Sequence, residues 1–192
     1  MNEASDPRSM AGSVVRLFEQ AESRIKELEL LYGDGLACHP INQLRYAGYH
    51  ITKAIAETNP TGNAEQWKRA TRHCQRAIYD ASEMAIVYCL NEFKNFGDDY
   101  RTVDFSPTIP DYLDIVEKIE KAQNLLATTN HDTRYQKYKE CDRLFTDIKP
   151  LIDRLNRSRL ELNKRLRRNR INMLLVGATI LLAIVGLIAK HW

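Results

Sequence analysis

Residues 171–189 have the sequence INMLLVGATILLAIVGLIA, and this stretch decides how the rest of the chain can be arranged. It contains no charged residue and no proline, and Asn172 is its only strongly polar side chain. At about 1.5 Å of rise per residue, a helix here is roughly 28 Å long, close to the roughly 30 Å of hydrocarbon in a bilayer. The alternative is a central helix of a soluble core, which seldom stays apolar on every face for so long. We therefore predict a transmembrane helix.

The residues before this predicted span give it an orientation. Between positions 154 and 170 there are eight Lys or Arg residues and one acid, Glu161, so this block has a net charge of +7. Positive charge beside a single span resists translocation and is attracted to anionic lipid head groups. Since only three residues follow position 189, we expect a single-pass, tail-anchored protein of the inner (cytoplasmic) membrane, with the bulk of the chain in the cytoplasm. The predicted membrane-flanking basic residues are Arg154, Arg157, Arg159, Lys164, Arg165, Arg167, Arg168 and Arg170.

The remainder of the chain has the properties of one cytosolic domain. The whole sequence has a net charge of +3, so the part outside the basic block carries −4. A domain that binds nucleic acid by bulk charge is usually basic, so this balance argues against that class. Residues 1–149 are enough for one hydrophobic core and too few for two.

The cysteines do not form a metal motif. Four are spread along the chain without a CxxC pair, which in a cytosolic domain favours reduced, partly buried thiols. The neighbours Cys38–His39 and His73–Cys74 match no common zinc spacing. We predict no metal and no cofactor.

Hydrophobic periodicity predicts five helices and no strand. The predicted helices cover residues 7–32, 40–59, 64–96, about 108–127, and from about 132 onward. The fold class is therefore all-α, an antiparallel helical bundle with a C-terminal transmembrane helix. The longest cytosolic helix is expected to begin after a cap at Asn63 and to stop at Gly97. Its apolar seam is predicted to include Trp67, Ala70, Cys74, Ala77 and Ala81.

The predicted domains follow from these elements. Residues 1–149 would form the cytosolic bundle, residues 150–170 a basic juxtamembrane stalk, and residues 171–189 the span. Pro150 removes one backbone hydrogen bond, so it is expected to kink or interrupt the helix before the stalk.

Arg45 and His50, in the second predicted helix, are the main candidates for chemistry. An imidazole can move protons near neutral pH, and a guanidinium can stabilise charge that builds on a phosphate. Residues five apart in a helix point about 140° from each other, so these two need a second copy of the chain to converge on one phosphate. A plainer alternative is a hydrogen-bonded surface cluster of Arg45, His50 and Tyr46.

The Arg-x4-His spacing of Arg45 and His50 resembles the motif of the HEPN superfamily. Members are small all-helical bundles, and many are metal-independent ribonucleases of toxin–antitoxin, abortive-infection and RNA-targeting CRISPR systems. The resemblance implies Arg45 and His50 as catalytic residues, with Tyr46 in a supporting place, in a composite site between two protomers. The family often has Asn, Asp or His directly after the arginine, and Tyr46 departs from that pattern.

The HEPN-type motif together with one span is similar to the small membrane-anchored HEPN-like accessory proteins of type VI-B CRISPR systems. That resemblance implies an antiviral-defence effector that self-associates and acts at the membrane. Two alternatives stay open: a membrane-tethered, metal-independent endoribonuclease, and a helical scaffold or adaptor anchored to the membrane. The expected partners are membrane lipid, further copies of the chain, and RNA or an RNA-guided effector protein.

A stripe of small and polar residues within the span predicts self-association. Alternate steps of four and three residues from Leu151 reach the span and place one set of side chains on a single face. The members of this stripe are Asn172, Val176, Thr179, Ala183 and Gly186. Membrane helices associate through small residues that permit close approach and through polar side chains that bond across the contact. We expect a homo-oligomer, and such an assembly is compatible with a pore. The alternative is a passive monomeric anchor.

Overall fold

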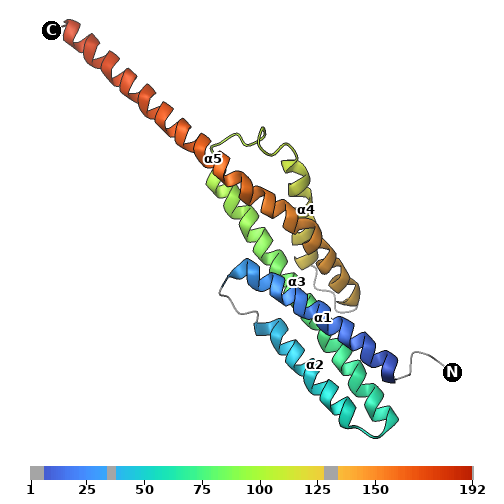
Figure 1. Cartoon of the computed structure of the whole chain (residues 1–192). Coiled ribbons are helices and arrows are strands. Elements are labelled where there is room, and N and C mark those ends of the chain that lie inside the picture. Colours follow the sequence, from blue (N-terminus) through green and yellow to red (C-terminus); the bar gives the residue numbers. More distant parts are fainter. Residues whose placement is uncertain (1–6, 34–37, 128–133, 192) are drawn as a thin grey trace.

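The computed structural model describes residues 7–33, 38–127 and 134–191, and within these ranges it contains five helices and no strand. The prediction of an all-α fold is confirmed. The helices are α1 (Pro7–Tyr32), α2 (Cys38–Ala56), α3 (Pro60–Tyr100), α4 (Tyr112–Ala127) and α5 (Arg134–His191), as Figure 1 shows. The predicted start of the last helix near residue 132 lies outside the described residues.

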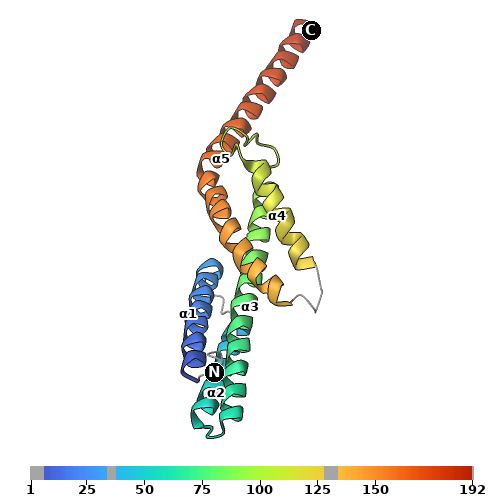
Figure 2. The same cartoon turned by 90° about the vertical axis from the view of Figure 1, so that its right-hand side faces the viewer.

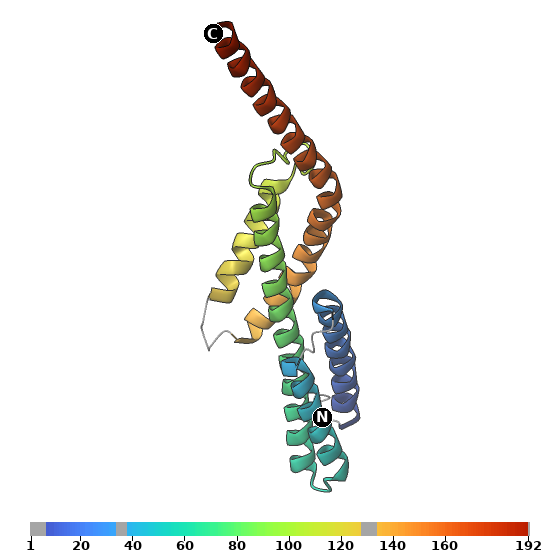
Figure 3. The same ribbon diagram turned by 90° about the vertical axis from the view of Figure 1, so that its left-hand side faces the viewer.

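α3 is the axis along which the other helices are arranged. α1 and α2 lie along its N-terminal half, and α4 and α5 lie along its C-terminal half (Figures 1, 2 and 3). Consecutive helices run in opposite directions, so α1, α3 and α5 point the same way. The result is an elongated arrangement of two three-helix groups that share α3, rather than one bundle around a single core.

Small residues on α3 allow α1 and α2 to approach closely. Ala70, Cys74, Ala77, Ala81 and Ala85 are fully buried and recur at steps of three and four, which keeps them on one face. The residues of α1 that pack in the same clusters lie 56 or 57 positions earlier, as expected for parallel helices. The predicted apolar seam of this helix is confirmed.

The predicted start of α3 is wrong. The N-cap is Asn59 rather than Asn63, since the Asn59 side chain accepts a hydrogen bond from the Thr61 N–H at 3.0 Å. Pro60 follows at the first helical position, where its missing N–H costs nothing. Asn63 instead donates its amide to the Ala54 carbonyl at 2.6 Å, which ties the end of α2 to the beginning of α3.

The predicted stop at Gly97 is also wrong, because α3 continues to Tyr100. Tyr100 is 2% exposed, so the extra turn buries one more aromatic ring in the core, beside Phe96, which is 0% exposed. The Tyr100 hydroxyl donates to Asn163 Oδ1 at 2.9 Å on α5. A glycine inside a helix costs about 1 kcal/mol relative to alanine, and burying an aromatic side chain contributes more than that.

α5 is one helix of 58 residues that passes through Pro150. Of the kink or interruption predicted at Pro150, the interruption is absent. The proline is exposed, and the helix curves along α3 before it projects from the other helices (Figures 2 and 3). Ile152, Leu155 and Leu162, in the predicted stalk, are 0–2% exposed and belong to the core. The predicted boundary at Pro150 therefore coincides neither with a helix end nor with the edge of the core.

Candidate functional site

The segment of α5 over residues 171–189 has no partner among the described residues. Every residue in it is exposed, including the large apolar side chains Leu174, Leu181 and Leu182 at 74%, 65% and 71%. An 18-residue window of this helix has a mean hydropathy of 2.5, and none of that window is buried. In the part of the chain that the structure describes, α5 is the one helix long and apolar enough to cross a membrane.

The predicted basic block divides into two groups with different surroundings. Nη1 and Nη2 of Arg154 donate to the two carboxylate oxygens of Asp111. Arg159 Nη1 donates to Asp99 Oδ2 at 2.5 Å, and its guanidinium lies over the Phe96 ring at 5.6 Å. These two arginines therefore fasten α5 to the C-terminal end of α3 and to the segment before α4. Their acidic partners are not identifiable from the sequence alone.

Five of the other six basic residues are exposed, and the sixth, Arg165, is half-buried. Arg165 lies 3.5 Å from Glu161 on the same helix. The exposed members that form no ion pair with the described residues are Arg157, Lys164, Arg167, Arg168 and Arg170. Four of these five lie within seven residues of the exposed apolar segment.

The predicted self-association stripe lies on the exposed apolar segment, and its five members are all exposed. Thr179 Oγ1 donates within its own helix, where the Val176 and Leu175 carbonyls lie at 2.8 and 3.0 Å. Its hydroxyl is thus satisfied without a second helix, which leaves Asn172 as the polar group of the stripe. A side-chain carbon added at Gly186 would meet no atom within 4 Å, so this position is open in one copy of the chain.

Two histidines face each other between α2 and α3. His50 Nδ1 lies 2.7 Å from Gln66 Oε1, and His73 Nδ1 lies 2.9 Å from Gln43 Oε1. The two rings stack with centroids 5.3 Å apart and planes 11° from parallel. An amide oxygen only accepts, so Nδ1 of each ring is the donor in these two hydrogen bonds, and Nε2 takes part in neither.

The predicted pair Arg45 and His50 is not brought into contact. Arg45 is exposed and lies over the Tyr46 ring at 5.2 Å, and the Tyr46 ring is 5.5 Å from that of His73. The three predicted residues therefore share a surface patch through His73. His73 was not predicted as a member of this patch.

The pKa of His73 is lowered. Burial is the largest cause, followed by the charges of His50 on α2 and of Arg76 and Arg72 on α3. His73 is therefore neutral near pH 7, the form that can accept a proton at Nε2.

A stability measurement checks the lowered pKa of His73. The unfolded chain binds a proton at His73 more readily than the folded chain, so the folded protein should lose stability as pH falls below about 6.5. Thermal unfolding in mild detergent between pH 8 and pH 5 is expected to show a smaller drop for His73→Gln than for wild type. His39→Gln, at an exposed position of α2, is the matched control and should keep the wild-type drop. Equal drops for wild type and His73→Gln would contradict the assignment.

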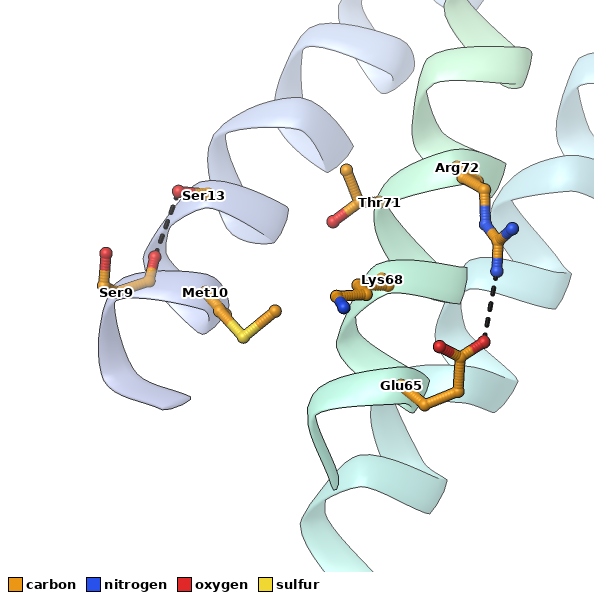
Figure 4. A pocket seen from close by; sticks show the side chains of 7 residues that line it. All are labelled: Ser9, Met10, Ser13, Glu65, Lys68, Thr71 and Arg72. Atoms are coloured by element: carbon orange, nitrogen blue, oxygen red, sulfur yellow. Dashed lines mark hydrogen bonds and ion pairs between the residues drawn. The ribbon is translucent and has the colours of Figure 1, made fainter. Parts of the chain in front are cut away.

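A cleft of about 610 Å³ separates the beginning of α1 from α3 (Figure 4). Its polar groups are largely occupied by one another. The Ser13 hydroxyl donates to the Ser9 carbonyl at 3.0 Å, and Glu65 accepts from Arg69 at 3.1 Å and from Arg72 at 3.3 Å. The hydrogen bond from Arg69 is the main cause of the lowered pKa of Glu65. The cleft offers no nucleophile paired with a base.

Metal-ligating side chains do not cluster in the described part of the chain, where no group of three or more His, Cys, Asp or Glu could hold an ion. Cys74 and Cys89 are buried, and burial raises the pKa of their thiols to about 11 and about 12. Both are therefore protonated and unreactive at neutral pH. Cys38 is exposed.

The comparisons with known proteins do not assign a family. A scan against protein-family models and searches of curated proteins and of solved structures find no match. The HEPN resemblance therefore rests on Arg45, His50 and the helical architecture, and it remains a hypothesis.

Proposed function

We propose that this chain is a membrane-anchored, self-associating effector of antiviral defence, with α5 crossing the inner membrane and the other helices in the cytoplasm. The observation that carries the membrane part is the fully exposed apolar segment 171–189, which continues the same helix that packs against α3. The defence role rests on the HEPN resemblance.

The continuity of α5 gives the proposal a mechanism. The contacts that hold its packed part near the apolar segment include Arg154 to Asp111, Arg159 to Asp99, and Asn163 to the Tyr100 hydroxyl. The sequence has no glycine between residue 98 and residue 176, so no glycine hinge separates this part from the span. A movement of α3 against its neighbours would thus be passed to the membrane helix without a flexible joint.

Self-association is proposed to use the stripe from Asn172 to Gly186. Lipid chains solvate leucine as well as a partner helix does, so the face of small residues and Asn172 is favoured for the contact. The free basic residues at 164–170 on neighbouring copies repel one another, and anionic head groups between them offset this repulsion.

The self-association is tested by crosslinking the full chain in mild detergent. Thr179→Leu and Gly186→Leu enlarge the proposed contact face and are expected to abolish most crosslinked oligomer. Leu175→Ala and Leu182→Ala change the remaining surface of the same helix and should leave the oligomer largely intact. A wild-type monomer at every concentration, or a greater loss from the two alanine variants, would contradict the proposal.

A second function is favoured by one observation, the stacked pair of His50 and His73. An imidazole whose Nε2 atom is not used in these hydrogen bonds can supply a base to RNA cleavage, and the exposed Arg45 can stabilise charge on the phosphate. The site would need a second protomer, because Arg45 and His50 point to different sides of α2.

The ribonuclease is tested with purified full chain, single-stranded RNA and excess EDTA. If the pair is catalytic, His50→Gln, His73→Gln and Arg45→Lys should each lower the cleavage rate at least about a hundredfold, in line with general acid–base contributions. Lys53→Gln, on the same exposed face of α2, is the control and should retain most activity. Wild-type protein that cleaves no RNA, or His50→Gln with full activity, would exclude this function.

A further inference from the structure

A cleft lies where the packed part of α5 meets the exposed apolar segment. It has a volume of about 510 Å³ and is lined by Thr102, Leu166, Asn169, Arg170, Asn172 and Met173. Thr102 comes from the connection between α3 and α4, and the other five residues come from α5. The cleft thus brings two parts of the chain together at one level along α5.

The depth of this cleft relative to the bilayer follows from the membrane part of the proposed function, on which this inference rests. With residues 171–189 centred in the bilayer, Ile180 is at the midplane and Arg170 is about 15 Å from it along the helix. That distance is the edge of the hydrocarbon layer, where the phosphates and glycerol groups of lipids begin. A long arginine side chain reaches further outward into the phosphate layer.

The lining residues offer the chemistry that a phosphodiester requires. Arg170 is exposed and has no ion pair with the described residues, so its guanidinium is free for a charge-assisted hydrogen bond. The Asn169 amide and the Thr102 hydroxyl are additional donors. Leu166 and Met173 supply an apolar wall for the first carbons of an acyl chain.

We propose that this cleft binds the phosphate of an anionic glycerophospholipid from the cytoplasmic leaflet. The arrangement differs from diffuse attraction to the basic block, because Thr102 and the two asparagines carry no charge and yet line the cleft. A lipid bound there joins the α3–α4 connection to α5 at the membrane surface. The bound head group would thereby fix the direction in which the span leaves the cytosolic helices.

Native mass spectrometry of the full chain in mild detergent, titrated with phosphatidylglycerol, tests the site. Arg170→Gln is expected to weaken binding of the first lipid about tenfold or more, the usual effect of losing a charge-assisted hydrogen bond. Arg167→Gln removes the same charge from an exposed position outside the cleft and should weaken it by less than about threefold. Thr102→Val changes no charge and should weaken binding several-fold. Equal losses for Arg170→Gln and Arg167→Gln, or wild-type affinity in Thr102→Val, would overturn the site.

Two further experiments distinguish a failure of this inference from a failure of the proposed function. Inorganic phosphate in about tenfold molar excess over the lipid should not displace phosphatidylglycerol, because phosphate lacks the apolar contacts with Leu166 and Met173. Displacement would show an anion site that is not a lipid site, and would overturn the inference. Carbonate extraction of membranes that contain each variant reports insertion. If the wild type inserts into membranes but Arg170→Gln and Arg167→Gln weaken lipid binding equally, only this inference is wrong. If the wild type does not insert, the proposed function is wrong as well.

Discussion

Arginine at both Ile180 and Leu181 is expected to move the protein from the carbonate-resistant membrane pellet to the soluble fraction. The two positions lie at the centre of the apolar segment, and both side chains are more than half exposed. Each arginine at the centre of a span costs about 2.5–3.5 kcal/mol on insertion scales, and a leucine or isoleucine contributes only about −0.3 to −0.6. Two such changes exceed what the remaining apolar residues can offset.

The matched control is the double change of Ile180 and Leu181 to alanine, which shortens the same side chains without adding charge. It should stay in the membrane pellet. Helices α1 to α4 and the packed part of α5 should remain helical by circular dichroism in both variants, because no residue of 171–189 is buried against them. Retention of the double-arginine variant in the pellet would show that the segment is not what holds the protein to membranes.

Phe145→Ala is expected to lower the free energy of unfolding by about 3–5 kcal/mol, the usual cost of removing a buried aromatic ring. Phe145 is 0% exposed and lies in the main core cluster on α5. The Arg24 guanidinium lies over its ring at 4.9 Å, and the same arginine pairs with Asp142 at 2.7 Å. The change therefore leaves a cavity and also removes support from the contact that joins α1 to α5.

Urea unfolding in mild detergent, followed by circular dichroism, measures this effect. Leu113→Ala removes a large apolar side chain that is 79% exposed on α4, and it should change stability by less than about 0.5 kcal/mol. A loss below about 1 kcal/mol for Phe145→Ala would mean that α5 does not pack against α3 as described. The proposed rigid link between the cytosolic helices and the span would then fail too.

The features predicted from the sequence are those set by local composition and periodicity. The apolar segment needs no tertiary information, because every residue in it has the same character. The seam of α3 was predicted because small apolar residues recur at helical spacing from Ala70 to Ala81.

Helix ends and the course of α5 could not be predicted in the same way, because long-range packing decides them. Gly97 is a stop signal only if nothing beyond it is buried, and Tyr100 is buried through its contact with Asn163, 63 positions away. Pro150 is similarly a local breaker, yet Ile148 and Ile152 on either side are buried and hold the helix together.

Only part of each candidate site could be predicted, because the other members are brought in by long-range packing. Arg45, Tyr46 and His50 were identifiable from spacing within one helix, whereas His73 belongs to another helix. An available signal was the register: as the position on α2 rises by seven from Gln43 to His50, its partner on α3 falls by seven from His73 to Gln66. Within the basic block, the acidic partners of Arg154 and Arg159 lie more than 40 positions away. Charge counting therefore could not separate these two arginines from those that face solvent.

The topology of the full chain in the membrane tests the central claim most directly. Protease is added to intact spheroplasts that carry an epitope at the N-terminus, and the fragments are compared with those from lysed spheroplasts. With α5 crossing the inner membrane and residues 1–170 in the cytoplasm, the tagged protein should stay full length until the spheroplasts are lysed and should then be digested. Digestion of the tagged helices in intact spheroplasts would contradict the account.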